Sequence, residues 1–208
     1  GNTHNGGSDA YVTKIDNSGN TIFNVQFGDS GDEVAKDITV DSSGNFYVVG
    51  TDDGNGFLRK FDGSGSSASE TYSFDLGSLG TGGTVEGVVL DSAGDVLITG
   101  STTNASLAST VVNAHSSGLD GFVFKVDDRT TTAAESYVTY IGTSGTDNAL
   151  DITIDTTTNN VYISGSTTGQ FTGEAQVGSQ DAFLTKLSAN GALTWTHQFG
   201  GAFNHSAN

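Results

Sequence analysis

The chain contains 208 residues, with 24 Asp and Glu against 7 Lys and Arg, so its formal net charge is −17 at pH 7. It has no Cys, which excludes a disulfide framework and a Cys-ligated zinc or iron–sulfur site. No apolar run is long enough to cross a bilayer, and the negative charge repels phosphate backbones, so we expect neither membrane insertion nor a nucleic-acid partner. The length fits one domain over residues 1–208. Because the chain opens with Gly1 and contains no Met, we expect a piece excised from a longer translation product.

The first predicted element is a strand at residues 9–16, and this segment recurs four times along the chain. Each copy reads aromatic, aliphatic, variable, Lys, apolar, and the lysines are 46, 65 and 61 residues apart. An aromatic-rich strand follows each copy and ends in an apolar residue and Gly. Recurrence at such a period indicates a repeat architecture. Four of the seven basic residues occupy one repeat position: Lys14, Lys60, Lys125 and Lys186.

The first complete unit follows, with strands predicted at 34–41, 45–51, 56–62 and 70–77. These runs are short, rich in Val, Ile, Thr, Tyr and Phe, and flanked by turn residues, which is the signature of strands. Asp41-Ser-Ser-Gly-Asn45 predicts a tight turn, because the Asp carboxylate accepts backbone N–H groups and Gly adopts a positive φ. No window carries apolar residues at helical spacing together with caps.

Four short strands in each unit of this length are typical of a propeller blade. We therefore predict an all-β fold, a β-propeller of four-stranded antiparallel blades, with about three and a half blades in this chain. The half blade covers 9–28 and the complete blades cover 34–77, 84–142 and 148–200. Residues 199–208 parallel 27–36 and would begin another unit. A half blade leaves a strand edge unpaired, so we expect other blades, or copies of the same protein, to pair with it.

The repeat resembles a known family. The pattern [Ala/Gly]-[Tyr/Phe]-[Val/Leu]-x-Lys-[apolar]-Asp, then Phe-Gly-x-x-Gly-[Asp/Thr]-[Asp/Glu/Asn], then Ile-x-Val-Asp-x-x-Gly-Asn-x-Tyr-Val-x-Gly is similar to the bacterial SBBP β-propeller repeat, with Phe27 to Gly50 as the best match. The resemblance covers almost all of residues 9–201, although the Pro that the family often carries between the second and third strands is absent. The resemblance implies a module of a large bacterial protein, extracellular or at the cell surface.

Acidic residues after the half blade are the best candidates for a metal site. They lie among Gly and Ser, and the last unit is also rich in oxygen donors at the equivalent place. Carboxylate oxygens are ligands that Ca²⁺ prefers, whereas the Asp-x-x-Gly-Asn turns lack EF-hand spacing. The alternative interpretation is that these are solvated carboxylates at strand starts and turns, which we favour for the two that are expected beside the central channel, Asp37 and Asp151. The candidate calcium ligands are Asp29, Asp32, Glu33, Asp37, Asp147 and Asp151.

We interpret the other chemically versatile residues as structural. The repeated lysines are expected to pair with carboxylates of their own blades, for which Asp41, Asp91 and Asp155 are the plausible partners. The four His share no repeat position and form no HExxH motif, and no GxSxG elbow is present, so we name no catalytic residue. Trp195 aligns with aromatic residues of the other units and is interpreted as part of the core rather than as a sugar-stacking residue.

Variation concentrates in the loops that connect the second and third strands of each unit. Loops 101–119 and 166–180 are long, whereas 51–55 is short. Such loops of a repeat scaffold usually carry binding specificity, although unselected drift would also lengthen them. We therefore predict a non-enzymatic module with a structural, adhesive or protein- or glycan-recognition role. The alternatives are a polysaccharide lyase or hydrolase acting at the channel, and a calcium-dependent assembly module.

Overall fold

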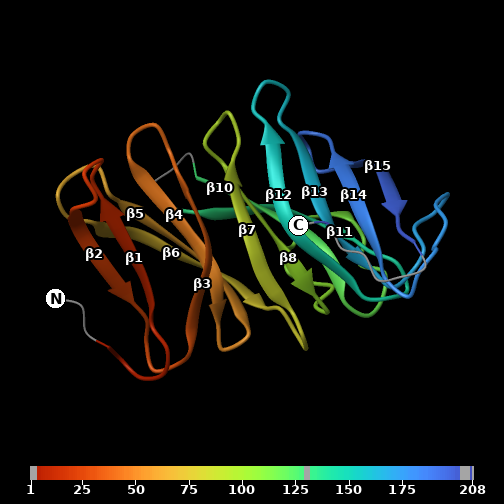
Figure 1. Cartoon of the computed structure of the whole chain (residues 1–208), viewed down its shortest axis with the longest axis horizontal. Coiled ribbons are helices and arrows are strands. Elements are labelled where there is room, and N and C mark those ends of the chain that lie inside the picture. The colour runs from red at the N-terminus through yellow and green to blue at the C-terminus, as the bar shows by residue number, and fades with distance from the viewer. Residues whose placement is uncertain (1–3, 129–131, 202–206, 208) are drawn as a thin grey trace.

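The computed structural model describes residues 4–128, 132–201 and 207, and within them it contains fifteen β-strands and no helix. The predicted all-β class is therefore confirmed. The strands form a two-stranded hairpin followed by three larger sheets, which stand side by side in chain order (Figure 1). The described residues include no helix of the length and apolar character that a membrane span requires.

Three of the four sheets follow the simplest possible order, in which strands adjacent in the chain pair with each other in antiparallel fashion. The hairpin is β1 (Ala10–Ile15) and β2 (Thr21–Phe27). The second sheet is β3 (Glu33–Val40), β4 (Asn45–Asp52), β5 (Asn55–Asp62) and β6 (Ser69–Ser78). The last sheet is β12 (Asp147–Asp155), β13 (Asn160–Thr167), β14 (Asp181–Leu187) and β15 (Leu193–Phe199).

The third sheet departs from the predicted four antiparallel strands. It contains β7 (Thr84–Leu90), β8 (Val96–Thr102), β10 (Asp120–Asp127) and β11 (Ala134–Ile141), and a fifth strand, β9 (Val111–Asn113). Strand β9 comes from the long loop before β10 and lies parallel to β11 on its outer side. Its place follows from loop length, because the loop can reach the edge of the sheet and cover it.

The hydrophobic core lies between consecutive sheets rather than within one of them. One cluster joins the hairpin to the second sheet through stacked rings, with the centroids of Phe23 in the hairpin and Phe46 in the second sheet 6.1 Å apart. A second cluster contains residues of both the second and third sheets, and a third contains residues of the third and fourth sheets. Each sheet is therefore stabilised mainly by burying its faces against its neighbours.

The first strand of each large sheet carries a β-bulge at the same repeat position. The pairing shifts by one residue between Ala35 and Asp37 in β3, and the same shift occurs in β7 and β12. A Gly lies opposite each bulge, where an added Cβ would collide with a backbone carbonyl oxygen of the bulged strand. These glycines therefore lie inside the second strands, where the bulge brings the backbones close. They are Gly50, Gly100 and Gly165.

Some apolar side chains of the hairpin and of β3 are exposed to solvent. The side chains at the equivalent positions of the other sheets are buried. Tyr11 is 71% exposed, whereas Phe122 of β10, at the equivalent position, is fully buried. Ile38 of β3 is 46% exposed, whereas Ile152 of β12 is 5% exposed. Tyr11 is exposed because β1 pairs with β2 alone, while β5, β10 and β14 each have strands on both sides. Ile38 is exposed because only the two-stranded hairpin precedes β3, whereas β12 packs against β7 and β8 of the sheet before it.

Candidate functional site

Both long loops singled out in the sequence meet at one cleft of about 600 Å³ between the third and fourth sheets. Loop 101–119 contributes Asn113, Ser116 and Ser117, and loop 166–180 contributes Gln170, Phe171 and Thr172. The end of β11 and the strand β15 complete the wall, through residues 141–144 and 193–196. These lining residues carry hydroxyl, amide, aromatic and aliphatic groups, and none of them is charged.

Trp195 lines this cleft instead of lying fully inside the core as we predicted. It is partly exposed, whereas Phe23, at the same position of the outermost strand β2, is buried because its ring packs against Phe46 of the next sheet. Its ring centroid lies 6.4 Å from that of Tyr162 and 5.0 Å from that of His197. Aromatic residues and uncharged hydrogen-bonding groups therefore line one concave surface, which is the usual composition of a small-ligand site.

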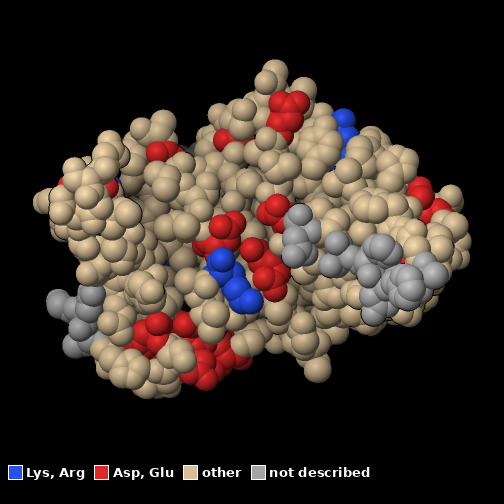
Figure 2. All heavy atoms as spheres, in the orientation of Figure 1, with Lys and Arg blue, Asp and Glu red and all other residues tan. Residues whose placement is uncertain are grey.

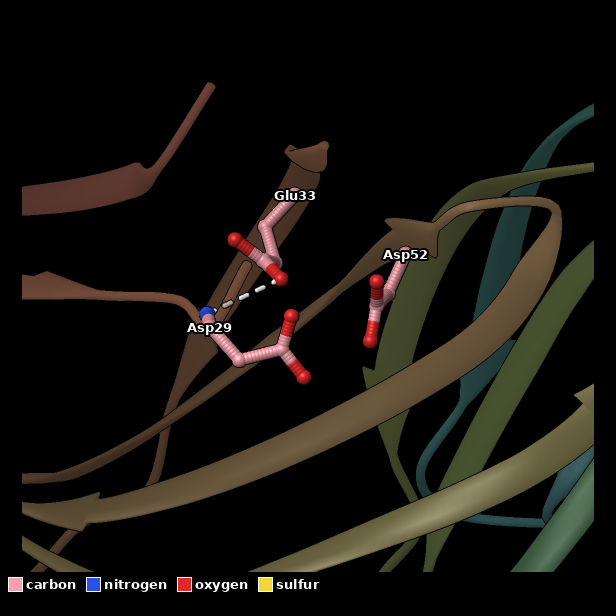
Figure 3. A group of neighbouring side chains, drawn as sticks. All are labelled: Asp29, Glu33 and Asp52. Carbon is pink, nitrogen blue, oxygen red and sulfur yellow. Dashed lines mark hydrogen bonds between the residues drawn. The ribbon is translucent and has the colours of Figure 1, made fainter. Parts of the chain in front are cut away.

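A separate group of three carboxylates lies where the hairpin leads into the second sheet. Single carboxylate oxygens of Asp29, Glu33 and Asp52 lie within 4.8 Å of one another. Figure 3 shows the three groups turned toward a common gap, with the Asp29 N–H donating to Glu33 Oε1 at 3.1 Å. Glu33 is 2% exposed, and its Oε2 has no hydrogen-bond partner. In Figure 2, acidic side chains gather at the lower left, in the region of the hairpin and the second sheet.

Burial and mutual repulsion make it unfavourable for all three carboxyl groups to be ionised at once. Burial raises the pKa of Glu33, and the nearby charge of Asp52 adds to that rise. Burial also raises the pKa of Asp52, where the charges of Asp29 and Asp53 act in the same direction. Arg59 offsets part of the effect on Asp52, but its guanidinium also pairs with Glu70 at 3.1 Å. A proton or a cation at the gap would relieve this repulsion.

The structure brings together two of the six predicted calcium ligands, Asp29 and Glu33, and adds Asp52. Asp32 lies outside the group and accepts the Ser8 N–H at 2.7 Å. The remaining three each accept backbone N–H groups: Asp37 from Val88 at 2.8 Å, Asp147 from Thr143 at 2.7 Å, and Asp151 from Ile152 at 2.8 Å. Asp37 thereby ties β3 to β7, whereas Asp147 is fully buried beside threonine hydroxyl groups.

The repeated lysines connect strands and sheets. Lys125 pairs with Asp91, as predicted, at 2.7 Å, and also with Asp95 at 3.0 Å. Lys60 pairs instead with Asp128 of the next sheet at 2.7 Å. Lys14 donates to the carbonyl of Gly63, also in the next sheet, and Lys186 lies 5.6 Å from the centroid of the Tyr162 ring. The predicted pairing within one unit therefore describes Lys125 but not Lys60, whose side chain reaches across the gap between sheets.

Two histidines share a repeat position that sequence analysis did not detect. His4 Nδ1 lies 3.3 Å from Asp9 Oδ2, and His115 Nδ1 lies 3.8 Å from Asp120 Oδ2. In both cases the His precedes by five residues an Asp at the start of the third strand of a unit. Counting residues backward from that Asp in each unit would have shown that both His occupy the same position. Their geometry is that of side chains that hold a loop against a strand.

Comparison with known proteins found one informative similarity. No family model matches the chain. The chain is 26% identical, over an alignment of 234 residues, to "Regulatory protein FlaEY" of Caulobacter vibrioides. The alignment covers 97% of this chain but 24% of that protein, so the chain spans about a quarter of the length of this curated relative.

Proposed function

We propose that the chain is a non-enzymatic β-propeller module that recognises a neutral glycan as part of a larger protein. The observation that carries this proposal is the convergence of loops 101–119 and 166–180 with Trp195 on one uncharged cleft. A pyranose ring presents an apolar face that an indole can cover, and hydroxyl groups that Ser, Thr, Asn and Gln can bond. A charged ligand would find no counter-charge among the lining residues.

The same composition argues for binding rather than cleavage. A lyase or hydrolase needs a general acid or base within hydrogen-bond reach of the reacting atoms. No Asp, Glu, His, Lys or Tyr is among the residues that line the cleft. Asp120 and Asp147, which flank the two loops, are fully buried and accept bonds from their own loops.

Two further observations support the wider setting. The match to a relative about four times as long as this chain supports a role as one unit of a longer protein. The resemblance to the SBBP repeat is the support for an extracellular or cell-surface location in bacteria. The propeller arrangement is supported by three successive sheets with the same bulge and the same core between them.

The glycan proposal predicts that neutral oligosaccharides change the fluorescence of Trp195, which is the single Trp of the chain. A panel of neutral and uronic-acid oligosaccharides, titrated against the protein, is expected to give a saturable change with neutral members only. Thr172→Arg, at the cleft, should weaken that binding at least about tenfold, because a long cation fills the site. Thr156→Arg, in an exposed turn of the same sheet, is the matched control and should bind as the parent does. Absence of a response to every neutral sugar, or equal binding by Thr172→Arg, would contradict the proposal.

The propeller proposal predicts that the half sheet accepts two more strands of the same repeat. We expect a chain in which residues 1–8 are replaced by a copy of residues 33–54, the β3–β4 hairpin with its exit turn, to be more stable than the parent. The added hairpin would cover Tyr11 and Ile15, which are 71% and 60% exposed, and raise Tm by about 5 °C or more. The control is the same fusion in which the added hairpin carries Ser in place of the residues copied from Phe46, Val48 and Val49. Equal Tm values for the two fusions, measured by circular dichroism, would mean that the edge does not select a blade strand.

A further inference from the structure

The acidic group at the first junction, where β2 leads into β3, has counterparts at the two later junctions. Each junction has three equivalent positions. The first position follows the Gly at the end of one sheet. The second is at or directly before the first strand of the following sheet, and the third is the last residue of that sheet's second strand. Strand pairing sets Glu33 opposite Asp52 and Asp147 opposite Thr167, so the positions correspond. The three sets are Asp29, Glu33 and Asp52; Ser78, Gly83 and Thr102; and Thr143, Asp147 and Thr167.

The third junction satisfies its one carboxylate with hydroxyl groups. Asp147 is fully buried, and it accepts the Thr143 N–H at 2.7 Å and the Thr143 hydroxyl at 3.0 Å. The Thr167 side chain also bonds to this carboxylate. The second junction has no acid at these positions. At these three positions, therefore, neither later junction holds more than one carboxylate, although Asp120, the counterpart of Asp9, lies near Asp147 and its Oδ1 also lacks a partner.

The first junction has carboxylates where the third has hydroxyl groups. Asp29 and Asp52, when ionised, cannot donate to Glu33, so only the Asp29 N–H remains as a donor to it. Glu33 Oε2 is buried without a partner, and so is Oδ1 of Asp9, whose side chain is 1% exposed. Both of these oxygens lie against Gly28, where a Cβ would collide with them. A buried carboxylate with one unpaired oxygen and like charges beside it is costly, so this arrangement favours a positive partner.

The protein's own cations do not fill the gap. His4 bonds the other oxygen of Asp9 at 3.3 Å, and its side chain is 64% exposed. Arg59 lies over the Phe27 ring, 5.1 Å from the centroid, and pairs with Glu70. Neither forms an ion pair with Glu33 or Asp29 among the described contacts.

We propose that Asp29, Glu33 and Asp52 form a calcium site that fastens the β2–β3 connection to the end of β4. All available donors are carboxylate oxygens, which suit a hard cation. Oxygens up to 4.8 Å apart are compatible with Ca²⁺, whose ligands lie at about 2.3–2.6 Å, whereas Mg²⁺, at about 2.0–2.1 Å, requires them to draw together. The site is independent of the glycan cleft, since it lies at the other end of the row of sheets.

The experiment compares the parent with Asp29→Thr/Asp52→Thr, which gives the first junction the hydroxyl groups of the third. After removal of metal by a chelator, Ca²⁺ is titrated by calorimetry and by its effect on Tm, in 0.15 M KCl. The parent is expected to bind one Ca²⁺ and to gain stability, by about 2.7 kcal/mol when free Ca²⁺ is a hundredfold above Kd. The double variant should lose the calcium response and, without metal, unfold at or above the Tm of the metal-free parent. Mg²⁺ should act more weakly on the parent.

Asp62→Asn/Asp75→Asn removes two charges elsewhere on the second sheet and is the matched control for general screening. It should keep the full calcium response. A parent that binds no Ca²⁺, or a double variant that responds as the parent does, would overturn the site. If the parent is stabilised by acid but not by Ca²⁺, the gap holds a proton shared between the carboxylates, and the calcium site is likewise refuted. Should the double variant fail to fold, Asp52→Asn alone must show the weakened calorimetric binding.

Discussion

Replacing Lys125 by Met is expected to lower the free energy of unfolding by about 3 kcal/mol at neutral pH, because it leaves buried charges without a cation. Lys125 Nζ lies 2.7 Å from Asp91 and 3.0 Å from Asp95, and the two carboxylate side chains are 5% and 3% exposed. Met preserves most of the aliphatic stem, so packing changes little. Urea denaturation followed by circular dichroism gives the difference between the two proteins.

The pH dependence separates this explanation from a packing defect. Burial alone would lower the pKa of Lys125, but bonds and charges from Asp91 and Asp95 outweigh it and raise the pKa above 10.5. The stabilisation is therefore complete below pH 10.5 and is lost as the pH rises through the higher folded-state pKa. Lys36→Met, which breaks an exposed pair with Glu86 at 3.6 Å, should cost less than about 1 kcal/mol. Equal losses for both variants would refute the argument.

Replacing Gly165 by Ala is expected to destabilise the fourth sheet by about 3 kcal/mol. Its Cβ would collide with the carbonyl oxygen of Asn148 and with the ring of Phe183. The backbone cannot withdraw, because the bulge in β12 fixes the distance between the two strands. Gly50 and Gly100 meet the same obstacle, so Gly100→Ala should behave alike in the third sheet.

The matched control for this prediction is Gly65→Ala in the loop between β5 and β6, where no atom lies closer than 4.0 Å to the added Cβ. That variant should unfold within about 1 kcal/mol of the parent. The free energies come from urea denaturation of each variant. A Gly165→Ala protein as stable as Gly65→Ala would mean that the bulged strand relaxes freely.

Strand positions and turns were predictable from the sequence because they depend on local chemistry. Asp41 shows this, since its Oδ1 accepts the N–H groups of Ser43 and Asn45 at 2.8 and 2.9 Å, and Gly44 has a φ of 86°. Burial alone would raise the pKa of Asp41, but the hydrogen bonds from Asn45 outweigh burial, so the pKa is lowered. The recurrence of Lys14 and its counterparts located the third strand of every unit without reference to any distant contact.

The candidate sites depend on register and on loop paths, which the sequence does not determine. Counting from the turn at 41–45 without a bulge places Asp53 opposite Glu33, and the bulge after Ala35 moves Asp52 there instead. The path of loop 103–119, including the strand Val111–Asn113 beside β11, decides which side chains reach the cleft. Trp195 is interpreted from the sequence as a core residue because it aligns with aromatic residues of the other units. Phe23 and Tyr137 are indeed buried, but within the described residues no further sheet follows that of Trp195.

The links between consecutive sheets have a consequence for how the molecule opens. Lys14 reaches the second sheet, and Lys60 and Asp37 join the second to the third. Strands of adjacent sheets also contact each other directly, β7 with β3 and β4, and β12 with β7 and β8. Stability in such a row is close to a sum of nearest-neighbour terms, as in a linear array. The β1–β2 hairpin has a neighbour on one side and only two strands, whereas the sheet at the other end has four, so the hairpin opens with the smallest free energy and local unfolding spreads from there toward β15. A cation held at the first junction would act where the row is weakest.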